Sequence, residues 1–275
     1  MKLKHKIVLI TGAGRGLGKG IAKAFADQGA KVVVNEREEK NAADTVAMIK
    51  GAGGDAIPIG ADISSSKDVE NMFAKAVEHY GTVDILINNA AITPSSDASR
   101  KARAAFLEMI STPIEKHSLE ITKNIDDAEW NRIINVNLTG VFYCTREALK
   151  IMEAKKYGKI VNIASIAAVS GMSFHSPHYS ASKAGVVGFT RSVALEVIGA
   201  NVNVNCIACG GILTESWDAA FKAMGKETQA RQLQMIPAGR MGKIEEYASL
   251  AVYLASDDAA YIVGQTINMN GGVVT

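Results

Sequence analysis

The chain has 275 residues, of which 48% are hydrophobic and 21% charged, and its net charge is +2. This composition predicts a globular protein of one large α/β domain or two small ones, and it gives no sign of a nucleic-acid or membrane-surface partner. No apolar run is long enough for a membrane span or a signal peptide, and three cysteines are too few for a disulfide framework, so we expect a cytoplasmic protein with reduced thiols.

Short β-branched runs alternate with longer helical patterns along the chain. Helical patterns at about 17–28, 38–51, 67–80, 127–154, 179–198 and 243–255 separate runs that predict seven strands: 6–10, 31–35, 56–60, 83–88, 159–164, 202–207 and 265–270. The runs are apolar nearly throughout, as in strands that are covered on both faces. We therefore predict one doubly wound α/β domain over 1–275, with a seven-stranded, mainly parallel sheet and helices on both faces. Ligands of such sheets bind beyond the carboxyl ends of the strands.

Two segments, at about 92–126 and 210–237, do not fit this alternation. In the first, apolar residues at helical spacing predict an amphipathic helix: Ala102, Ala105, Phe106, Met109 and Ile110. In the second, Trp217, Phe221 and Met224 repeat at the same spacing. Such stripes usually pack against the core, and the functional alternative is that they close over a substrate. The cations of the first segment (Arg100, Lys101 and Arg103) fit a solvated helix face better than a site for an anionic substrate.

A glycine-rich stretch, TGAGRGLG (11–18), follows the first predicted strand. Its glycines are spaced G-x-x-x-G-x-G, at Gly12, Gly16 and Gly18, which is not the G-x-G-x-x-G fingerprint. Glycines still permit positive φ and a close approach of the backbone, and the next helix offers free N–H groups to a pyrophosphate. Glycines in a turn can also serve only tight packing, but this position in the strand–helix alternation favours nucleotide binding.

Three polar features follow later predicted strands. Glu36 ends the second strand about 20 residues after the glycines, where a carboxylate accepts hydrogen bonds from ribose hydroxyls and repels a 2′-phosphate. This favours NAD, although Arg37 is placed to attract that phosphate and both belong to a charged run that a solvated surface also explains. Asp62 follows the third strand and is a candidate adenine contact. Asn88 to Ala91 follow the fourth, near the expected cofactor path, although Asn pairs also occur in plain turns.

A phenol and an ammonium lie one helical turn apart in HYSASKAG (178–185). On a helix, Tyr179 and Lys183 share one face, and a nearby ammonium is expected to lower the pKa of the phenol toward neutrality, as proton transfer at a carbonyl or alcohol oxygen requires. Ser165, at the carboxyl end of the fifth strand, is a better candidate for contacting the same oxygen than Ser170, Ser173 or Ser176. Asn137 is a candidate for holding a relay water, or else a buried amide satisfied by the backbone.

The cysteines and histidines give weaker signals. Cys206 and Cys209 form a C-x-x-C, but no second pair or His cluster accompanies them, so we expect no metal site. A strand is also not the helix N-terminus that lowers a thiol pKa, so the cysteines are expected to be incidental. His175 and His178 are more typical of ordinary packing than of a substrate contact.

The motifs taken together resemble the classical short-chain dehydrogenase/reductase family over essentially the whole chain. They are TGAGRGLG, NNAA, VNLTG, Ser165, YSASK, VNCIACGGILT and the closing MNGG. The resemblance implies a Rossmann-type domain that binds NAD(P)(H), and a tetrad of Asn137, Ser165, Tyr179 and Lys183. Tyr179 would be the acid/base, Ser165 would polarise the carbonyl, Lys183 would hold the nicotinamide ribose, and Asn137 would anchor the relay water.

The resemblance also implies further contacts and an assembly. Cofactor contacts would come from Gly12, Gly14, Arg15, Gly16, Leu17, Gly18, Glu36, Arg37, Asp62, Ile63, Asn89, Ala90, Ala91, Tyr179, Lys183, Gly210, Ile212 and Thr214. Substrate contacts would come from Ser165, Met172, Phe174, Tyr179, Gly211 and Trp217, with 210–237 as a lid. Family members are commonly homotetramers or homodimers, with contacts through the helices at 127–154 and 179–198 and the last strand.

The chain departs from the family pattern in four places. Ala91 replaces the glycine of NNAG, Cys209 replaces the proline of a Pro-Gly turn, the Ser165–Tyr179 spacing is about one residue longer, and the segment 92–126 is extended. None of these changes removes a chemical group.

The leading interpretation is an enzyme that transfers a hydride between NAD(H) and a secondary alcohol or ketone. One alternative is an NADPH-dependent 3-ketoacyl-type reductase, which Arg37 keeps open. Another is a dinucleotide-sensing protein without activity, for which the presence of both Tyr179 and Lys183 is unexpected.

Overall fold

The core of the protein is a sheet of seven parallel strands in the order β3-β2-β1-β4-β5-β6-β7. The computed structural model describes residues 1–94, 96–111, 117–173, 175–223 and 225–275. The strands are β1 (Ile7–Ile10), β2 (Lys31–Glu36), β3 (Asp55–Gly60), β4 (Ile85–Asn88), β5 (Gly158–Ser165), β6 (Val202–Cys209) and β7 (Thr266–Met269). The predicted fold class is confirmed, and the order reverses between β1 and β4, which is where such sheets bind ligands.

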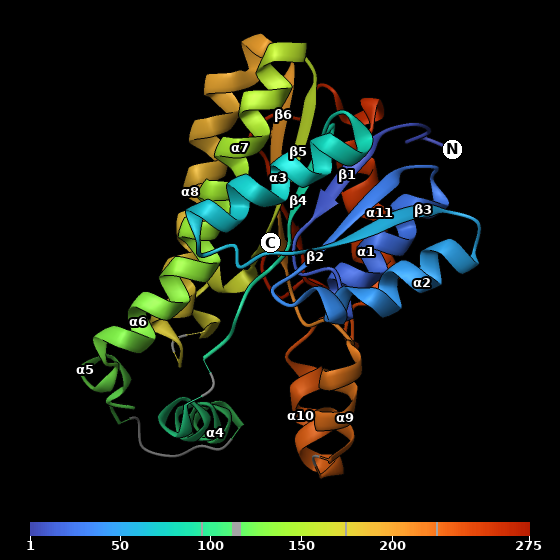
Figure 1. Ribbon diagram of the computed structural model, residues 1–275. Coiled ribbons are helices and arrows are strands. Elements are labelled where there is room, and N and C mark those ends of the chain that lie inside the picture. The colour runs from blue at the N-terminus through green and yellow to red at the C-terminus, as the bar shows by residue number, and fades with distance from the viewer. Residues whose placement is uncertain (95, 112–116, 174, 224) are drawn as a thin grey trace.

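Helices cover both faces of the sheet, as Figure 1 shows. One face carries α1 (Gly16–Asp27), α2 (Ala43–Gly51) and α11 (Ile244–Ala255), and the other carries α3 (Ser66–Tyr80), α7 (Gly140–Lys155) and α8 (Pro177–Val197). Short 3₁₀ turns lie at Glu39–Ala42, Ile166–Ala168, Gly171–Ser173, Ile198–Ala200 and Asp257–Ala259.

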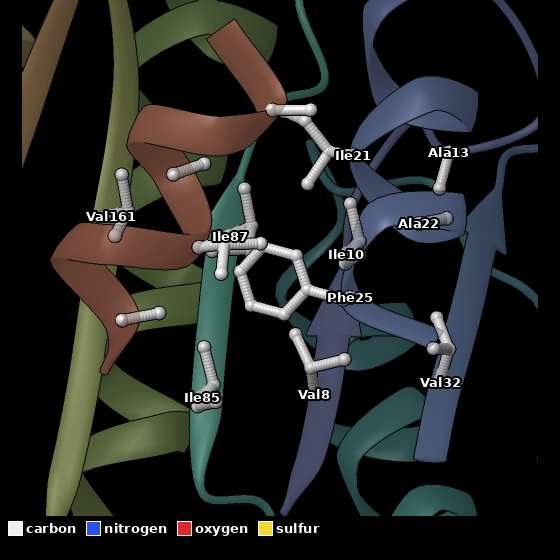
Figure 2. Packing of buried hydrophobic residues seen from close by; sticks show 14 of the residues in the cluster. Val8, Ile10, Ala13, Ile21, Ala22, Phe25, Val32, Ile85, Ile87 and Val161 are labelled. Carbon is white, nitrogen blue, oxygen red and sulfur yellow. The ribbon is translucent and has the colours of Figure 1, made fainter. Parts of the chain in front are cut away.

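Alternate residues of each strand point to opposite faces, so the two layers of core have separate membership. Val8 and Ile10 of β1 pack under α1, whereas Leu9 between them packs on the other face. Figure 2 shows Phe25 of α1 lying against this first face, next to Ile87 of β4. Phe25 is fully buried, so the helix that follows the glycine loop is fixed firmly to the sheet.

The long helical pattern predicted at 127–154 is interrupted. It consists of α6 (Asp127–Ile134), a π-helical turn at Asn135–Thr139, and α7. A π turn inserts one extra residue into the ladder and is frequent at functional sites. Here it carries Asn137, whose fully buried side chain the sequence pattern placed in an ordinary helix.

Both segments that broke the alternation contain helices. The first forms α4 (Asp97–Ser111) and the short α5 (Ile121–Asn124), and the second forms α9 (Glu215–Ala223) and α10 (Lys226–Gln234). The predicted amphipathic helix is confirmed, with Ala102 and Phe106 buried. Because α4 follows β4 and α9 follows β6, both project beyond the carboxyl edge of the sheet (Figure 1).

A line of polar side chains crosses the otherwise apolar centre. Asn88 of β4 donates from Nδ2 to Thr145 Oγ1 at 3.2 Å and to Asn162 Oδ1 of β5 at 2.8 Å. Asn162 in turn donates to Thr190 Oγ1 of α8 at 2.9 Å, and Thr190 donates to the Val186 carbonyl at 2.8 Å. This line ties α7, β4, β5 and α8 together below the predicted site.

Candidate functional site

Helix α8 presents the predicted phenol and ammonium at the carboxyl edge of the sheet. Pro177 occupies its first turn, where the missing N–H costs nothing, so the helix begins two residues earlier than predicted. Lys183 Nζ lies 6.0 Å from the centre of the Tyr179 ring and donates to the Ile163 carbonyl at 2.8 Å. Lys183 is buried, and that carbonyl holds its ammonium beneath the site.

The other two predicted tetrad residues lie beside this pair. Ser165 ends β5, its hydroxyl accepts from the Ala167 N–H at 3.2 Å, and its side chain interacts with the Tyr179 phenol. Asn137 exchanges two hydrogen bonds with the backbone of Ile92, accepting from its N–H at 2.8 Å and donating to its carbonyl at 2.9 Å. The amide also donates to Ser182 Oγ at 3.2 Å. Its buried groups are therefore satisfied by protein atoms.

The expectation that Lys183 lowers the pKa of Tyr179 is wrong for this structure. Although part of Tyr179 is exposed, desolvation dominates and raises its pKa to about 12, and the hydrogen bond with Ser165 only partly opposes this. The physical reason is the geometry of Lys183, whose ammonium is bound to a carbonyl instead of the phenol oxygen. A phenol with this pKa is protonated at neutral pH.

Burial acts on the ammonium in the opposite direction. It lowers the pKa of Lys183 from 10.5 to about 8 because no water solvates the charged form. The group is still mainly protonated at pH 7. Its charge disappears just above the physiological range, so the electrostatics of this site depend on pH under mildly alkaline conditions.

The glycine loop is shaped by its backbone and by the chain that follows β4. Gly12 and Gly16 have φ of 61° and 53°, in the left-handed region. A Cβ on Gly12 would lie 2.8 Å from Ala90 Cα, so a side chain here would collide with the backbone after β4. Asn89 Nδ2 donates to the carbonyls of Thr11 and Gly12, each at 3.0 Å. The NNAA motif thus supports the glycine loop, and its predicted contact with the cofactor stays a prediction.

The N-terminus of α1 fits an anionic group. Its N-cap residue, Arg15, is extended and makes no side-chain capping hydrogen bond, and no acidic side chain lies in the first turn. The first N–H groups and the positive end of the helix dipole therefore stay available to phosphate oxygens. Gly18 packs against the Gly12 carbonyl and leaves no room for a Cβ. Leu17 packs against the core beneath.

Glu36 stands at the end of β2 beside the glycine loop. Its Oε1 accepts from the Gly14 N–H at 3.0 Å, which fixes a carboxylate where a ribose is expected. Arg37 points to solvent, with 75% of its side chain exposed and Glu38 at 3.9 Å. The Glu36 carboxylate therefore contacts the glycine loop, whereas the Arg37 guanidinium lies in solvent beside it.

Asp62 and Ile63 follow β3 at the same edge. Asp62 Oδ1 accepts from both the N–H and the hydroxyl of Ser64, at 2.9 and 2.6 Å, so this carboxylate is held in its turn. Ile63 is buried, and a Cβ on Gly140 would lie 2.8 Å from its Cδ1. Ala90 packs against the core, whereas Ala91 is exposed.

The chain after β6 closes the other side of the site. The Gly210 N–H donates to the Met269 carbonyl at 2.8 Å. A Cβ on residue 210 would lie 2.6 Å from Asn270 Cα, so the close approach of the MNGG segment requires glycine at position 210. Ile212 forms a β-bridge with Gly242. A Cβ added to Gly16 would lie 3.6 Å from Thr214 Cγ2. The chain after β6 therefore lies next to the glycine loop.

The predicted substrate residues are only partly described. Phe174 and Met224 lie outside the described residues, as does the side chain of Met172. On α9 the rings of Trp217 and Phe221 are centred 5.5 Å apart, so these two residues of the predicted stripe contact each other. Gly211 packs close to Met241.

The loop before Tyr179 is in contact with helix α4. The ring of His175 lies 4.7 Å from that of Phe106. Desolvation, and then the charge of Arg103, lower the pKa of His175 to about 4. Ser170 donates to the Ile166 carbonyl at 2.9 Å, and Ser176 is the buried N-cap of α8. Ser165 is the serine whose side chain acts on the pKa of the Tyr179 phenol.

The cysteines have raised thiol pKa values. Burial raises the pKa of Cys206 to about 11 and that of Cys209 to about 12, and both thiols are free. They lie on a strand, so the C-x-x-C does not have the environment of a reactive dithiol. Within the described ranges, no three His, Cys, Asp or Glu side chains are grouped to hold a metal ion.

A cavity of about 350 Å³ lies away from the tetrad, between α4 and α5. It is lined mainly by the insertion, and Glu129 of α6 forms part of its wall. In the part of the chain that the structure describes, no helix is both long and apolar enough to cross a membrane.

Two residues of the site were missed by sequence reasoning. Thr11 Oγ1 accepts from the N–H groups of Asn89 and Ala90, each at 3.0 Å, so it joins β1 to the chain after β4. Ser182 donates to the Tyr179 carbonyl at 2.7 Å and accepts from Asn137. Their place within TGAGRGLG and YSASK was the available signal.

Comparisons with known proteins agree with this geometry. A family model described as short chain dehydrogenase matches residues 6–225. A 3-oxoacyl-[acyl-carrier-protein] reductase from Synechocystis sp. is 38% identical over 99% of this chain and 98% of that protein. The subunit BbsD of (2S)-[(R)-hydroxy(phenyl)methyl]succinyl-CoA dehydrogenase from Thauera aromatica is 35% identical over 99% of this chain and 98% of its own length.

A solved structure extends the agreement to three dimensions. A short-chain type dehydrogenase/reductase from Mycobacterium marinum superimposes with a TM-score of 0.82 at 30% identity, covering 99% of this chain and 97% of its own. The chain therefore belongs to the short-chain dehydrogenase/reductase family, whose members are oxidoreductases that use a nicotinamide dinucleotide.

Proposed function

We propose that this enzyme reduces a 3-oxoacyl thioester to the 3-hydroxyacyl thioester, with Tyr179 as the proton donor. The observation that carries the proposal is the grouping of the Tyr179 phenol with the Ser165 side chain at the end of β5 and with the buried ammonium of Lys183, which lies 6.0 Å from the ring centre. When bound, the nicotinamide supplies the hydride to the carbonyl carbon. Tyr179 supplies the proton to the carbonyl oxygen, so a ketone becomes a secondary alcohol.

The protonation state of the phenol fits the role of proton donor in the proposed reduction. Because its pKa is raised to about 12, Tyr179 carries its proton at neutral pH. A general acid needs this state, whereas alcohol oxidation needs a base. The Lys183 ammonium, held by the Ile163 carbonyl beneath the site, is placed to hold the ribose of the cofactor, and the Ser165 hydroxyl donates to the oxygen that develops negative charge. The Asn137 amide, fixed by Ile92, orients the π turn next to Lys183 and Ser182.

The names of the relatives support the substrate class. The Synechocystis relative is a 3-oxoacyl reductase acting on an acyl carrier protein, and the Thauera relative is a dehydrogenase subunit for a coenzyme A thioester. Both names place a thioester in the substrate, which favours the 3-ketoacyl alternative over an unspecified secondary alcohol. In this proposal α4 and the 210–237 segment flank the acyl group.

The substrate class is tested by comparing acetoacetyl-coenzyme A with 2-pentanone, a methyl ketone that has no thioester, in the presence of NADH or NADPH. We expect kcat/KM for the thioester to be higher by about 10²-fold or more, because remote contacts to the thioester position the carbonyl. Equal rates for both ketones would refute the thioester proposal and leave a general ketone reductase.

The choice of cofactor depends on Glu36. Its carboxylate is held beside the glycine loop by the Gly14 N–H, so it accepts from ribose hydroxyls and repels a 2′-phosphate. We propose that NADH is preferred for this reason.

Glu36→Ala is expected to improve the Kd for NADPH relative to that for NADH by about tenfold, or ~1.4 kcal/mol. Titrating the nicotinamide fluorescence of both cofactors measures this ratio, and Glu39→Ala, on the neighbouring turn, is the matched control. An unchanged ratio would mean that Glu36 does not read the ribose. NADPH preference in the native protein would assign the selection to Arg37.

A further inference from the structure

His178, the residue before Tyr179, is buried without a hydrogen bond. Its side chain is 1% exposed, and neither ring nitrogen has a hydrogen-bond partner among the described residues. An imidazole in this state costs free energy that the fold must offset. The polar atom that faces it is Glu129 Oε1 on α6, 3.6 Å from Nε2. This separation is slightly too long for a hydrogen bond and closes with a movement of a few tenths of an ångström.

Glu129 connects three elements at this point. Its side chain is 14% exposed, and Oε1 also lies 4.0 Å from the Arg132 guanidinium on the same helix. Ser99 of α4 donates from its hydroxyl to the same oxygen at 3.4 Å. One carboxylate oxygen therefore faces the insertion helix α4, the helix α6, and the first turn of α8.

The charges around the pair favour a neutral imidazole. Burial lowers the pKa of His178, Glu129 opposes this, and the charge of Arg132 adds to the lowering. A neutral ring with its proton on Nε2 donates to the carboxylate without needing a full ion pair. The 3.6 Å separation is therefore an approach that a small movement converts into a hydrogen bond, and contacts near a reaction centre are often long before substrate binds.

We propose that Glu129 and His178 form a positioning pair for Tyr179, and that α4 acts on the pair through Ser99. His178 and Tyr179 are consecutive in the first turn of α8, so fixing the imidazole fixes the backbone that carries the phenol. Ser99 donates to Glu129 Oε1 and so holds the carboxylate that faces His178, which links α4 to the backbone that carries Tyr179. This inference rests on the proposed function for the reaction that is read out, and it gives α4 a positioning role in catalysis.

The pair is tested with Glu129→Ala, and with Glu129→Gln as the conservative variant. Alanine is expected to lower kcat for acetoacetyl-coenzyme A by about tenfold or more, with the KM for NADH unchanged, because misplacing a catalytic group affects mainly the chemical step. Glutamine is expected to restore most of kcat, since its amide oxygen accepts from neutral His178. Asp127→Ala, on an exposed position of the same helix, is the control.

The link to α4 is tested with Ser99→Ala in a double-mutant cycle. Ser99→Ala alone is expected to lower kcat, and to have no further effect in the Glu129→Ala background, because both changes break one chain of contacts. Additive losses would show that Ser99 does not act through Glu129. A kcat within about twofold of the native value in Glu129→Ala would overturn the positioning pair itself.

A readout that needs no turnover separates this inference from the proposed function. Hydrogen exchange of the backbone over 176–183, measured with NADH bound, reports the first turn of α8, where the Ser180 N–H donates to the Ser176 carbonyl at 3.0 Å. We expect faster exchange in Glu129→Ala and native exchange in Glu129→Gln and Asp127→Ala. If the native protein fails to reduce the thioester, the proposed function is refuted. The hydrogen-exchange rates over 176–183 still test whether Glu129 and His178 form a positioning pair. Unchanged exchange in Glu129→Ala would refute it.

Discussion

Replacing Tyr179 with Phe is expected to lower kcat for ketone reduction by about 10²–10⁴-fold, the range that a positioned acid contributes. Phenylalanine keeps the ring and removes the hydroxyl that interacts with the Ser165 side chain. The Ser165 side chain still accepts from the Ala167 N–H, so the end of β5 stays in place. The loss is therefore chemical, and the Kd for the dinucleotide is expected to stay within about twofold of the native value.

Steady-state kinetics and a cofactor titration measure the two quantities separately. Tyr247→Phe is a matched control, because its hydroxyl donates to the Met269 carbonyl at 3.0 Å and is outside the tetrad. Turnover of Tyr179→Phe near the native rate would remove Tyr179 from the mechanism.

Replacing Lys183 with Met is expected to make the protein more stable and almost inactive. Lowering the pKa from 10.5 to about 8 means that holding this ammonium in the folded protein costs ~3 kcal/mol at neutral pH. Methionine fills a similar volume without charge, and losing the hydrogen bond to the Ile163 carbonyl offsets about 1 kcal/mol. The free energy of unfolding at pH 7 should therefore rise by about 2 kcal/mol.

The free energy of unfolding of the native protein should also depend on pH. The folded state holds the Lys183 proton less tightly than the unfolded state does, so native stability should rise as the pH increases from about 8 to 10.5. Lys183→Met should lack this rise, and the advantage of the variant should vanish near the upper limit. Urea unfolding at pH 7, 8.5 and 10 measures it. If Lys183→Met were less stable than the native protein at pH 7, burial of the Lys183 ammonium would not cost the folded state free energy.

The fold was accessible from the sequence because its signals are local. Apolar runs, glycines and helical periodicity predicted all seven strands and the main helices, with shifts of a few residues at their ends. The interruption at Asn135–Thr139 was not predictable, because a π turn changes the hydrogen-bond ladder without changing the apolar pattern of the long helix.

For the site, residue types were more predictable than their electrostatics. The motif predicted that Tyr179, Lys183 and Ser165 come together, which requires only topology. The direction of the Tyr179 pKa shift was predicted wrongly, because it depends on how much water each side chain loses and on which acceptor Lys183 Nζ binds. The Glu129–His178 contact is also invisible in sequence, since it joins residues of two helices that are brought together only by packing.

The polar line of Asn88, Asn162 and Thr190 has a consequence for how the chain finds its native pairing during folding. Strands β4 and β5 are otherwise rows of similar apolar side chains, which pack tolerably well in several alignments. Sliding β5 by two residues would keep its apolar face inward but would separate Asn162 from both partners and leave amide groups buried in hydrocarbon. The misaligned sheet is thereby penalised, so these amides select one alignment, and with it the height at which Ser165 stands beside Tyr179.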